Sequence, residues 1–264
     1  MHLQELIATE TDIKMNKEEL FIKNRLIELA NQAYNRGIYV SSDFLNLNEI
    51  NILNNINNEL PPVNRVLTGG NSYAERKIVI FDDYLEYECI LPILLLRISP
   101  LAPKFSGPLS HRDFLGSILG LGIDRAKIGD IFIKENEAFI YVKEEIADFI
   151  KENLSKVKHT NIKCEILDCN EVDVKPKFID IAATVTSVRL DKLISLAFNL
   201  ARNKVIPFIE NEKVFVNGKI ITSNAYKPHV GDIISVRGKG KFIYYSNNGL
   251  SKKERERIQL KIYN

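Results

Sequence analysis

The chain has 264 residues, of which 45% are hydrophobic and 27% are charged, a balance that is typical of soluble globular proteins and excludes wholesale disorder. Its length predicts two or three domains. The net charge of +2 hides an asymmetry, because residues 187–243 carry +6, residues 251–264 carry +3 and residues 1–186 carry −7. A basic C-terminal third indicates binding to a polyanion, although a solvated basic face that binds nothing would give the same count.

Three cysteines, Cys89, Cys164 and Cys169, are too few for a disulfide framework, and Cys164 and Cys169 lack the second pair or the nearby His of a zinc site. We therefore expect free thiols, no metal and no cofactor. No secretory signal is evident at the N-terminus, and the most apolar run, residues 89–96, is too short to span a membrane. These features predict a cytoplasmic protein that does not act at a membrane. We also expect a monomer.

Residues 1–75 are predicted to form a mainly helical N-terminal domain. Ile22, Leu26 and Leu29 recur at helical spacing, and residues 42–50 fit the start of a second helix. The pair at 61–62, Pro-Pro, ends this region.

Residues 76–168 alternate between strand and helix patterns. Strands are predicted at 77–81, 88–98, 128–133, 138–142 and 162–167, with helices at 110–121 and 143–154. Ser110 and Asp113 form the capping pair of the first of these helices. Without the first strand, the order is β-α-β-β-α-β, which predicts an RRM-like (ferredoxin-like) domain. No strand carries the aromatic run with which an RRM stacks bases, so RRM-type RNA binding is not predicted.

Residues 169–186 are predicted to be a linker in which 178–185 could pair as a strand, and residues 246–264 a basic tail with an extra helix. Between them, residues 187–245 predict two short helices on a small β-structure. Asn203 is expected to cap the second helix, with Pro207 in its first turn. Asn217-Gly218 predicts a tight hairpin.

Basic residues recur at definite places on this C-terminal segment. They lie at the start of the first helix, at the junction of the two helices, at the hairpin and around the glycines at 238 and 240. Free N–H groups at a helix start suit phosphate oxygens, and glycine permits close backbone approach. Such contacts would give a salt-dependent affinity with little sequence readout.

This segment resembles the S4 RNA-binding domain (αL-like). The matching blocks are Arg189–Leu193, Ala201–Lys204, Val214–Lys219, Val230–Ile234 and Val236–Gly238. The resemblance implies RNA contacts at Arg189, Lys192, Arg202, Asn203, Lys204, Asn217, Lys219 and Arg237, to which we add Lys213, Lys239 and Lys241. The sequence departs from the family pattern twice: Ala201 replaces a Ser, and Glu212 stands where a Gly ends the second helix.

Residues 110–130, from Ser110-His111-Arg112-Asp113 to Gly129-Asp130, are similar to the YlmH-type S4 proteins of bacteria and plastids. The resemblance implies an α+β fold with a helical N-terminal region, an RRM-like middle domain and a C-terminal S4 domain. It also implies binding to rRNA and tRNA on the large ribosomal subunit, in rescue or quality control of stalled ribosomes. Arg112, Arg125 and Lys127 are secondary candidates for RNA contact.

Three functions remain open from the sequence. The first, which we favour, is a non-enzymatic RNA-binding factor. The second is an RNA-modifying enzyme, because pseudouridine synthases carry an Arg-Leu-Asp triplet with a nucleophilic aspartate and often an S4 domain. Here the triplet belongs to the S4 pattern itself, so Asp191 is predicted to be structural, and His111, Arg112 and Asp113 lack a nucleophile. The third is an adaptor that binds proteins through residues 1–186.

Overall fold

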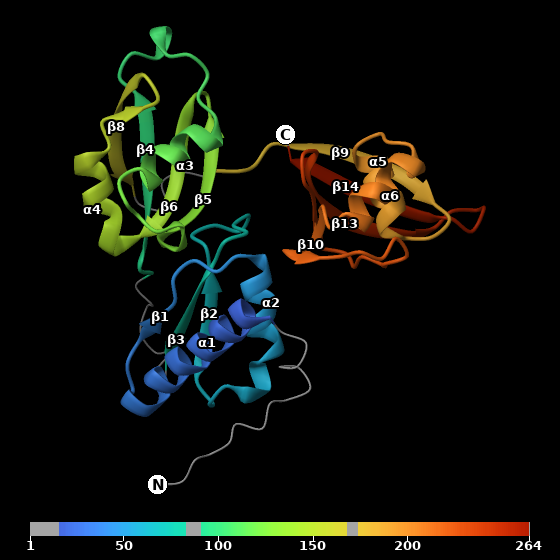
Figure 1. The fold of residues 1–264 in the computed structure, drawn as a ribbon, viewed down its shortest axis with the longest axis horizontal. Coiled ribbons are helices and arrows are strands. Elements are labelled where there is room, and N and C mark those ends of the chain that lie inside the picture. Colours follow the sequence, from blue (N-terminus) through green and yellow to red (C-terminus); the bar gives the residue numbers. More distant parts are fainter. Residues whose placement is uncertain (1–15, 83–90, 168–173, 264) are drawn as a thin grey trace. The chain divides into compact units, whose positions relative to one another are not determined.

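The computed structural model describes residues 16–82, 91–167 and 174–263, and the chain divides into two compact units, residues 1–174 and 175–264 (Figure 1). Each unit combines helices with antiparallel sheets around hydrophobic cores of its own. The predicted α+β class is confirmed. The finer domain boundaries within these units stay predictions.

Two helices of the N-terminal region begin with the same capping arrangement. Before α1 (Lys17–Arg36), the side chain of Asn16 accepts a hydrogen bond from the N–H of Glu19, and the Glu19 carboxylate accepts one from the N–H of Asn16. Asn46 and Glu49 form the same reciprocal pair at α2 (Leu47–Asn55). These bonds satisfy N–H groups that have no acceptor inside a helix.

The same region also contains an antiparallel sheet in which β1 (Val40–Ser41) and β2 (Asn64–Thr68) flank β3 (Ile78–Asp82). A short 3-10 helix, Asn57–Glu59, precedes β2. The expectation of a mainly helical region is wrong for β2. None of the residues of β2 is fully buried, so the strand lacks a clear alternation of apolar and polar residues in the sequence. Backbone pairing with β3 holds it in the sheet.

Strand β3 contributes to two cores at once, because successive side chains of a strand point to opposite faces. Val79 and Phe81 pack with the apolar residues of α1 and α2. Ile78 and Ile80 pack with residues of the middle sheet. The strand predicted at 77–81 is thus confirmed as β3, and its residues 78–81 are buried on both faces.

The middle part of the first unit has the predicted split β-α-β-β-α-β order. Its elements are β4 (Ile93–Pro100), α3 (His111–Leu119), β5 (Ile128–Lys134), β6 (Glu137–Lys143), α4 (Glu144–Asn153), β7 (Lys156–Val157) and β8 (Thr160–Leu167), with 3-10 helices at Pro103–Phe105 and Arg125–Lys127. The strands pair in the order β5-β6-β4-β8-β7, all antiparallel. This confirms the ferredoxin-like topology. Helices α3 and α4 pack on one face of the sheet (Figure 1).

The opposite face of this sheet is the one that an RRM uses for RNA, and here it is covered. Phe139 and Tyr141, which the sequence pattern did not single out, alternate along one face of β6. They are 5% and 0% exposed and pack with Phe44, Ile78 and Ile80 of the N-terminal region. They are unable to stack on bases because the protein itself buries them.

We expect Gly70→Ala to disrupt this packing. Gly70 has a φ of +90°, and a Cβ atom there would lie 2.2 Å from Cδ1 of Tyr141. Backbone strain and a ring that has nowhere to move should lower the free energy of unfolding by about 2–4 kcal/mol. Gly107→Ala is the control, because nothing lies within 4 Å of its Cβ position. Urea unfolding followed by circular dichroism measures both variants, and equal stability would contradict the packing described.

The second unit has a six-stranded antiparallel sheet with two helices on one face (Figure 1). Its elements are β9 (Phe178–Val185), α5 (Leu190–Ala197), α6 (Arg202–Glu210), β10 (Val214–Val216), β11 (Lys219–Ile220), β12 (Ile233–Val236), β13 (Gly240–Leu250) and β14 (Glu256–Tyr263). The strand order is β11-β10-β12-β13-β14-β9. Strand pairing of residues 178–185 is confirmed along the full length of β14.

The predicted extra helix in the C-terminal tail is wrong, because residues 256–263 form β14 between β13 and β9. Its apolar residues have period two: Ile258 and Leu260 are buried, and Arg257 and Gln259 between them are exposed. A period of two places them on one face of a strand. The basic side chains of this segment had obscured the alternation.

Helix α6 also begins earlier than predicted. Ala201 is its N-cap residue, in extended conformation, and the N–H of Lys204 bonds to the carbonyl of Ala201 at 2.8 Å. Asn203 is therefore the second residue of the helix and does not cap it. Pro207 lies inside the helix, where its ring replaces the N–H that would bond to the Asn203 carbonyl.

Candidate RNA-binding surface

A buried carboxylate joins the two helices of the second unit. Asp191 has no exposed surface, and its oxygens accept bonds from Nε (3.1 Å) and Nη2 (3.2 Å) of Arg189. Its Oδ2 also accepts a bond of 2.7 Å from Nε of Arg202. The side chains of Arg189 and Arg202 remain 30% and 57% exposed. One carboxylate thus fixes two guanidinium groups whose other N–H donors can reach a ligand.

The prediction that Asp191 is structural is confirmed by its burial and its hydrogen bonds. The carboxylate is buried and hydrogen-bonded to two arginines and to the N–H of Lys192 at 3.0 Å. A carboxylate so covered is not available to attack a base. The sequence did not predict that Arg189 and Arg202 share one carboxylate. The two residues lie on different elements, and no sequence pattern relates them.

The first turn of α6 extends this basic group. Arg202, Asn203 and Lys204 are exposed and follow one another at the positive end of the helix. Lys192 lies nearby on α5, but its Nζ donates to the hydroxyls of Thr186 (2.5 Å) and Ser187 (3.0 Å). Of these predicted contacts, Lys192 is therefore engaged within the protein, whereas the α6 residues face solvent.

A second basic group lies at the other end of α6. The N–H of Arg237 bonds to the carbonyl of Lys213 at 2.8 Å, which holds these exposed residues side by side. The Arg237 guanidinium lies 5.7 Å from the Phe215 ring centroid, and Nζ of Lys239 lies 5.9 Å from that of Phe208 on α6. Aromatic rings hold these cations against the protein surface.

Two further predicted residues, Asn217 and Lys219, lie at the β10–β11 hairpin. Asn217 and Gly218 have φ of 48° and 79°, as the predicted hairpin requires. The Asn217 amide donates to Asp232 (2.8 Å) and accepts from the N–H of Ile233 (2.9 Å), so its role in RNA contact stays a prediction beside a clear structural role. Lys219 is exposed at the hairpin.

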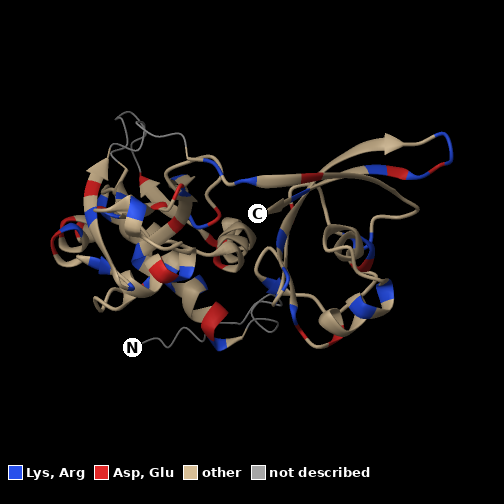
Figure 2. Ribbon diagram, turned by 90° about the horizontal axis from the view of Figure 1, so that it is seen from above, with Lys and Arg blue, Asp and Glu red and all other residues tan. Residues whose placement is uncertain are grey.

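Lys241 is not brought together with the helix residues. Its neighbour Phe242 is buried in the core beneath the helices, so Lys241 points to the opposite face of the sheet. Its Nζ lies 4.2 Å from the Tyr263 ring centroid on that face. Figure 2 shows Lys and Arg residues of this unit on its helices, its loops and its strands.

Glu212 ends α6 in the conformation that glycine prefers. Its φ is 57°, its N–H bonds to the carbonyl of Ile209 (3.2 Å), and the N–H of Lys213 bonds to that of Phe208 (2.9 Å). These two bonds form a Schellman motif. The departure from the family pattern at this position therefore leaves the cap intact but places an exposed glutamate in a left-handed conformation.

We expect Glu212→Gly to stabilise the protein by about 0.5–1 kcal/mol, because glycine adopts a left-handed conformation without strain. Glu212→Ala removes the same charge and keeps the strain, so it should give no gain. Thermal unfolding of the two variants separates charge from conformation. Equal melting temperatures for both would refute the strain argument.

The secondary candidates in the middle domain differ in their surroundings. Arg112 is exposed. Arg125 donates to two backbone carbonyls of β5, and burial lowers its pKa to about 10. Lys127 is paired with two carboxylates. The predicted capping pair is confirmed, since the Asp113 carboxylate accepts from both the N–H and the hydroxyl of Ser110.

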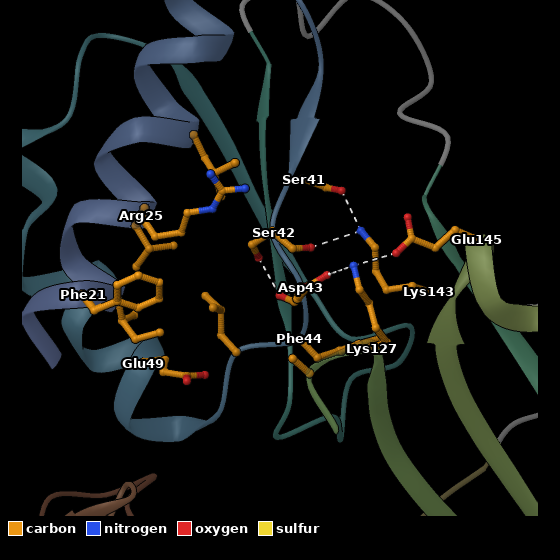
Figure 3. Close-up of a pocket in the computed structure, with 15 residues that line it drawn as sticks. Phe21, Arg25, Ser41, Ser42, Asp43, Phe44, Glu49, Lys127, Lys143 and Glu145 are labelled. Atoms are coloured by element: carbon orange, nitrogen blue, oxygen red, sulfur yellow. Dashed lines mark hydrogen bonds and ion pairs between the residues drawn. The ribbon is translucent and has the colours of Figure 1, made fainter. Parts of the chain in front are cut away.

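A pocket of about 440 Å³ lies in the first unit, between α1 and the middle sheet (Figure 3). Phe21 and Phe44 form part of an apolar wall. On the other side, Nζ of Lys127 pairs with Asp43 at 2.7 Å and with Glu145 at 2.6 Å. Charges of both signs that already neutralise one another make this an unsuitable surface for a polyanion.

Lys143 also lines this pocket, and its side chain is buried. It is 6% exposed, and its Nζ donates to Oγ of Ser41 (2.7 Å) and to the carbonyl of Ser42 (3.1 Å) (Figure 3). Burial lowers its pKa. These bonds connect β1 with β6, and the pocket is best described as a structural junction.

Neither a metal cluster nor a membrane-spanning helix occurs in the described part of the chain. Residues 16–82, 91–167 and 174–263 contain no group of three or more His, Cys, Asp or Glu that could hold a metal ion. No helix among them is long and apolar enough to cross a membrane. Cys164 is a free thiol whose burial raises its pKa to about 11, and Cys89 and Cys169 lie outside the described residues.

Two family models match the chain in succession. Residues 93–171 match the putative RNA-binding domain in YlmH, and residues 188–234 match the S4 domain. A relative from Bacillus subtilis (strain 168), the ribosome-associated protein quality control protein P2, is 29% identical over 222 residues, which are 82% of this chain and 84% of the relative.

A solved structure supports the fold. The cell division protein ylmH from Streptococcus pneumoniae superposes with a TM-score of 0.50 at 19% identity, over 60% of this chain and 97% of that one. Both domains occur here in the predicted order, and the described geometry agrees with each. The chain therefore combines a region that matches the putative RNA-binding domain in YlmH with a region that matches the S4 domain, and it is similar to a ribosome-associated quality control protein.

Proposed function

We propose that this protein is a non-enzymatic RNA-binding factor that binds rRNA and tRNA on the large ribosomal subunit. It acts as a monomer in the cytoplasm, in rescue or quality control of stalled ribosomes. The observation that carries this proposal is the pair of arginines fixed by buried Asp191 beside the exposed first turn of α6. The quality-control role named for the Bacillus subtilis relative supports the setting.

The mechanism is neutralisation of phosphates by cations that are held in place before RNA arrives. Arg189 and Arg202 offer planar donors that match phosphate oxygens, and Lys204 adds a mobile charge. The basic group at the far end of α6 extends the contact along the RNA backbone. Since contacts of this kind read shape and charge, structured RNA is the natural ligand.

An RNA-modifying enzyme remains the alternative function. The burial of Asp191 beneath two guanidinium groups disfavours the pseudouridine synthase mechanism, which needs an accessible aspartate. Incubation with rRNA, followed by mapping of modified bases, should reveal no new modification.

Co-sedimentation with purified large ribosomal subunits tests the binding proposal. The protein should pellet with the subunits at low salt and be released as salt rises, because phosphate contacts displace counterions. Failure to pellet at any salt concentration, by folded protein, would overturn the proposal.

A further inference from the structure

A groove on the middle domain has an exposed aromatic ring that nothing in the fold explains. The groove has a volume of about 600 Å³, within the range of ligand sites, and lies between the loop after β4 and the β7–β8 hairpin. Phe105, which lines it, is 91% exposed, and Leu101 beside it is 62% exposed. Large apolar side chains at such exposure mark interaction sites when they cluster.

The loop that presents Phe105 is held in place by hydrogen bonds. Asn136, in the β5–β6 turn, accepts from the N–H of Leu109 (2.7 Å) and donates to Oγ of Ser106 (2.8 Å) and the carbonyl of Gly107 (3.0 Å). The N–H of Phe105 bonds to the carbonyl of Ala102 at 3.1 Å. The exposed ring is therefore preorganised, which lowers the entropy cost of binding.

The two chain segments that contain the lining residues of the groove are net basic. These segments, residues 101–113 and 155–161, contain four Lys or Arg (Lys104, Arg112, Lys156 and Lys158), two His and one acidic residue, Asp113. Nζ of Lys158 pairs with Asp113 at 2.9 Å, which fixes the lysine at the rim, where its side chain is 54% exposed. An aromatic platform flanked by cations is the arrangement that single-stranded nucleic acids favour.

We propose that this groove binds an unpaired nucleotide of RNA, with the base stacked on Phe105 and its phosphates near Lys104 and Lys158. The inference rests on the proposed function and adds a second contact to it. It also accounts for how a ferredoxin-like domain with its sheet face covered contacts RNA: it uses a loop edge in place of the sheet. The charge around the groove favours RNA over a protein ligand.

The chain contains no tryptophan, so Phe105→Trp gives a single fluorescent reporter in the groove. The probe is a 12-nucleotide oligouridylate added to the full-length protein. We expect saturable quenching of the indole as bases stack on it, and no quenching by an RNA duplex, whose bases stack on one another. Phe149→Trp is the matched control, because Phe149 on α4 of the same domain is 47% exposed and should give no quenching.

Affinity is measured by anisotropy of the labelled oligouridylate in a protein that also carries Lys204→Glu, Lys213→Glu and Lys219→Glu. This background weakens the contribution of the S4 surface, because three of its lysines are reversed while Arg189 and Arg202 remain. Adding Phe105→Ala should weaken the residual binding about 5- to 150-fold, the range expected for loss of one base stack. Phe105 is exposed, so the variant should fold.

The outcomes separate this inference from the proposed function. If large subunits still bind the wild type but Phe105→Trp is not quenched and Phe105→Ala binds the probe unchanged, the groove inference is overturned and the proposed function stands. If the indole instead responds to RNA-free ribosomal protein, the groove is a protein-docking site and the inference is likewise overturned. Loss of subunit binding by the wild type is the result that counts against the proposed function.

Discussion

Reversing three charges, Lys204→Glu, Lys213→Glu and Lys219→Glu, should weaken binding to large ribosomal subunits by about 10²-fold at moderate salt. The three lysines are exposed, at the two ends of α6 and at the β10–β11 hairpin, so their replacement should leave the fold intact. Removal of each phosphate-binding lysine should also flatten the dependence of log K on log salt by about one unit. Sedimentation or anisotropy across a salt series measures both quantities.

The matched control reverses Lys17, Lys134 and Lys151, which are exposed residues of the first unit. It changes the net charge by the same amount without touching the proposed surface. Equal loss of binding in both triple variants would mean that overall charge, and no particular surface, drives association. An unchanged salt slope in the first variant would contradict phosphate contact by these lysines.

Asp191→Ala should have the largest effect on stability of the changes in the second unit. Its carboxylate is fully buried and makes bonds to Arg189, Arg202 and the N–H of Lys192. The arginines are partly exposed and can be rehydrated, so we expect a loss of about 2–3 kcal/mol in the free energy of unfolding, less than for a fully buried ion pair. RNA affinity should fall as well, because the guanidinium groups lose their fixed position.

Asp180→Ala is the control for this change. Asp180 belongs to the same unit, but its side chain is 73% exposed and its distance to Nζ of Lys261 is 3.6 Å. A surface ion pair of this kind contributes about 0–1 kcal/mol. If urea unfolding shows equal losses for Asp180→Ala and Asp191→Ala, the carboxylate clamp does not have the role described.

Much of the fold could be predicted because local signals carry it. The capping residues Ser110 and Asp113, the Asn217-Gly218 hairpin and the split β-α-β-β-α-β order each depend on residues close together in the chain. Such features need no knowledge of distant partners. The RNA contacts of the S4 segment were taken from its resemblance to the S4 domain, and they stay predictions.

The features that the sequence did not reveal depend on distant partners. Strand β14 is stabilised by β9, which lies far before it in the chain, and its basic residues disguised its alternation. The covered sheet face results from contact between β3 and β6. The bond between Asp191 and Arg202 links two helices. Tertiary packing decided each of these.

Crosslinking of the full-length protein to RNA in cells, followed by sequencing of the attached fragments, tests whether the protein binds large-subunit rRNA and tRNA through its S4 surface. We expect large-subunit rRNA and tRNA to dominate the recovered fragments, and the crosslinked peptides to include the first turn of α6. Recovery of no RNA above the level of the Lys204, Lys213 and Lys219 charge-reversal variant would contradict it.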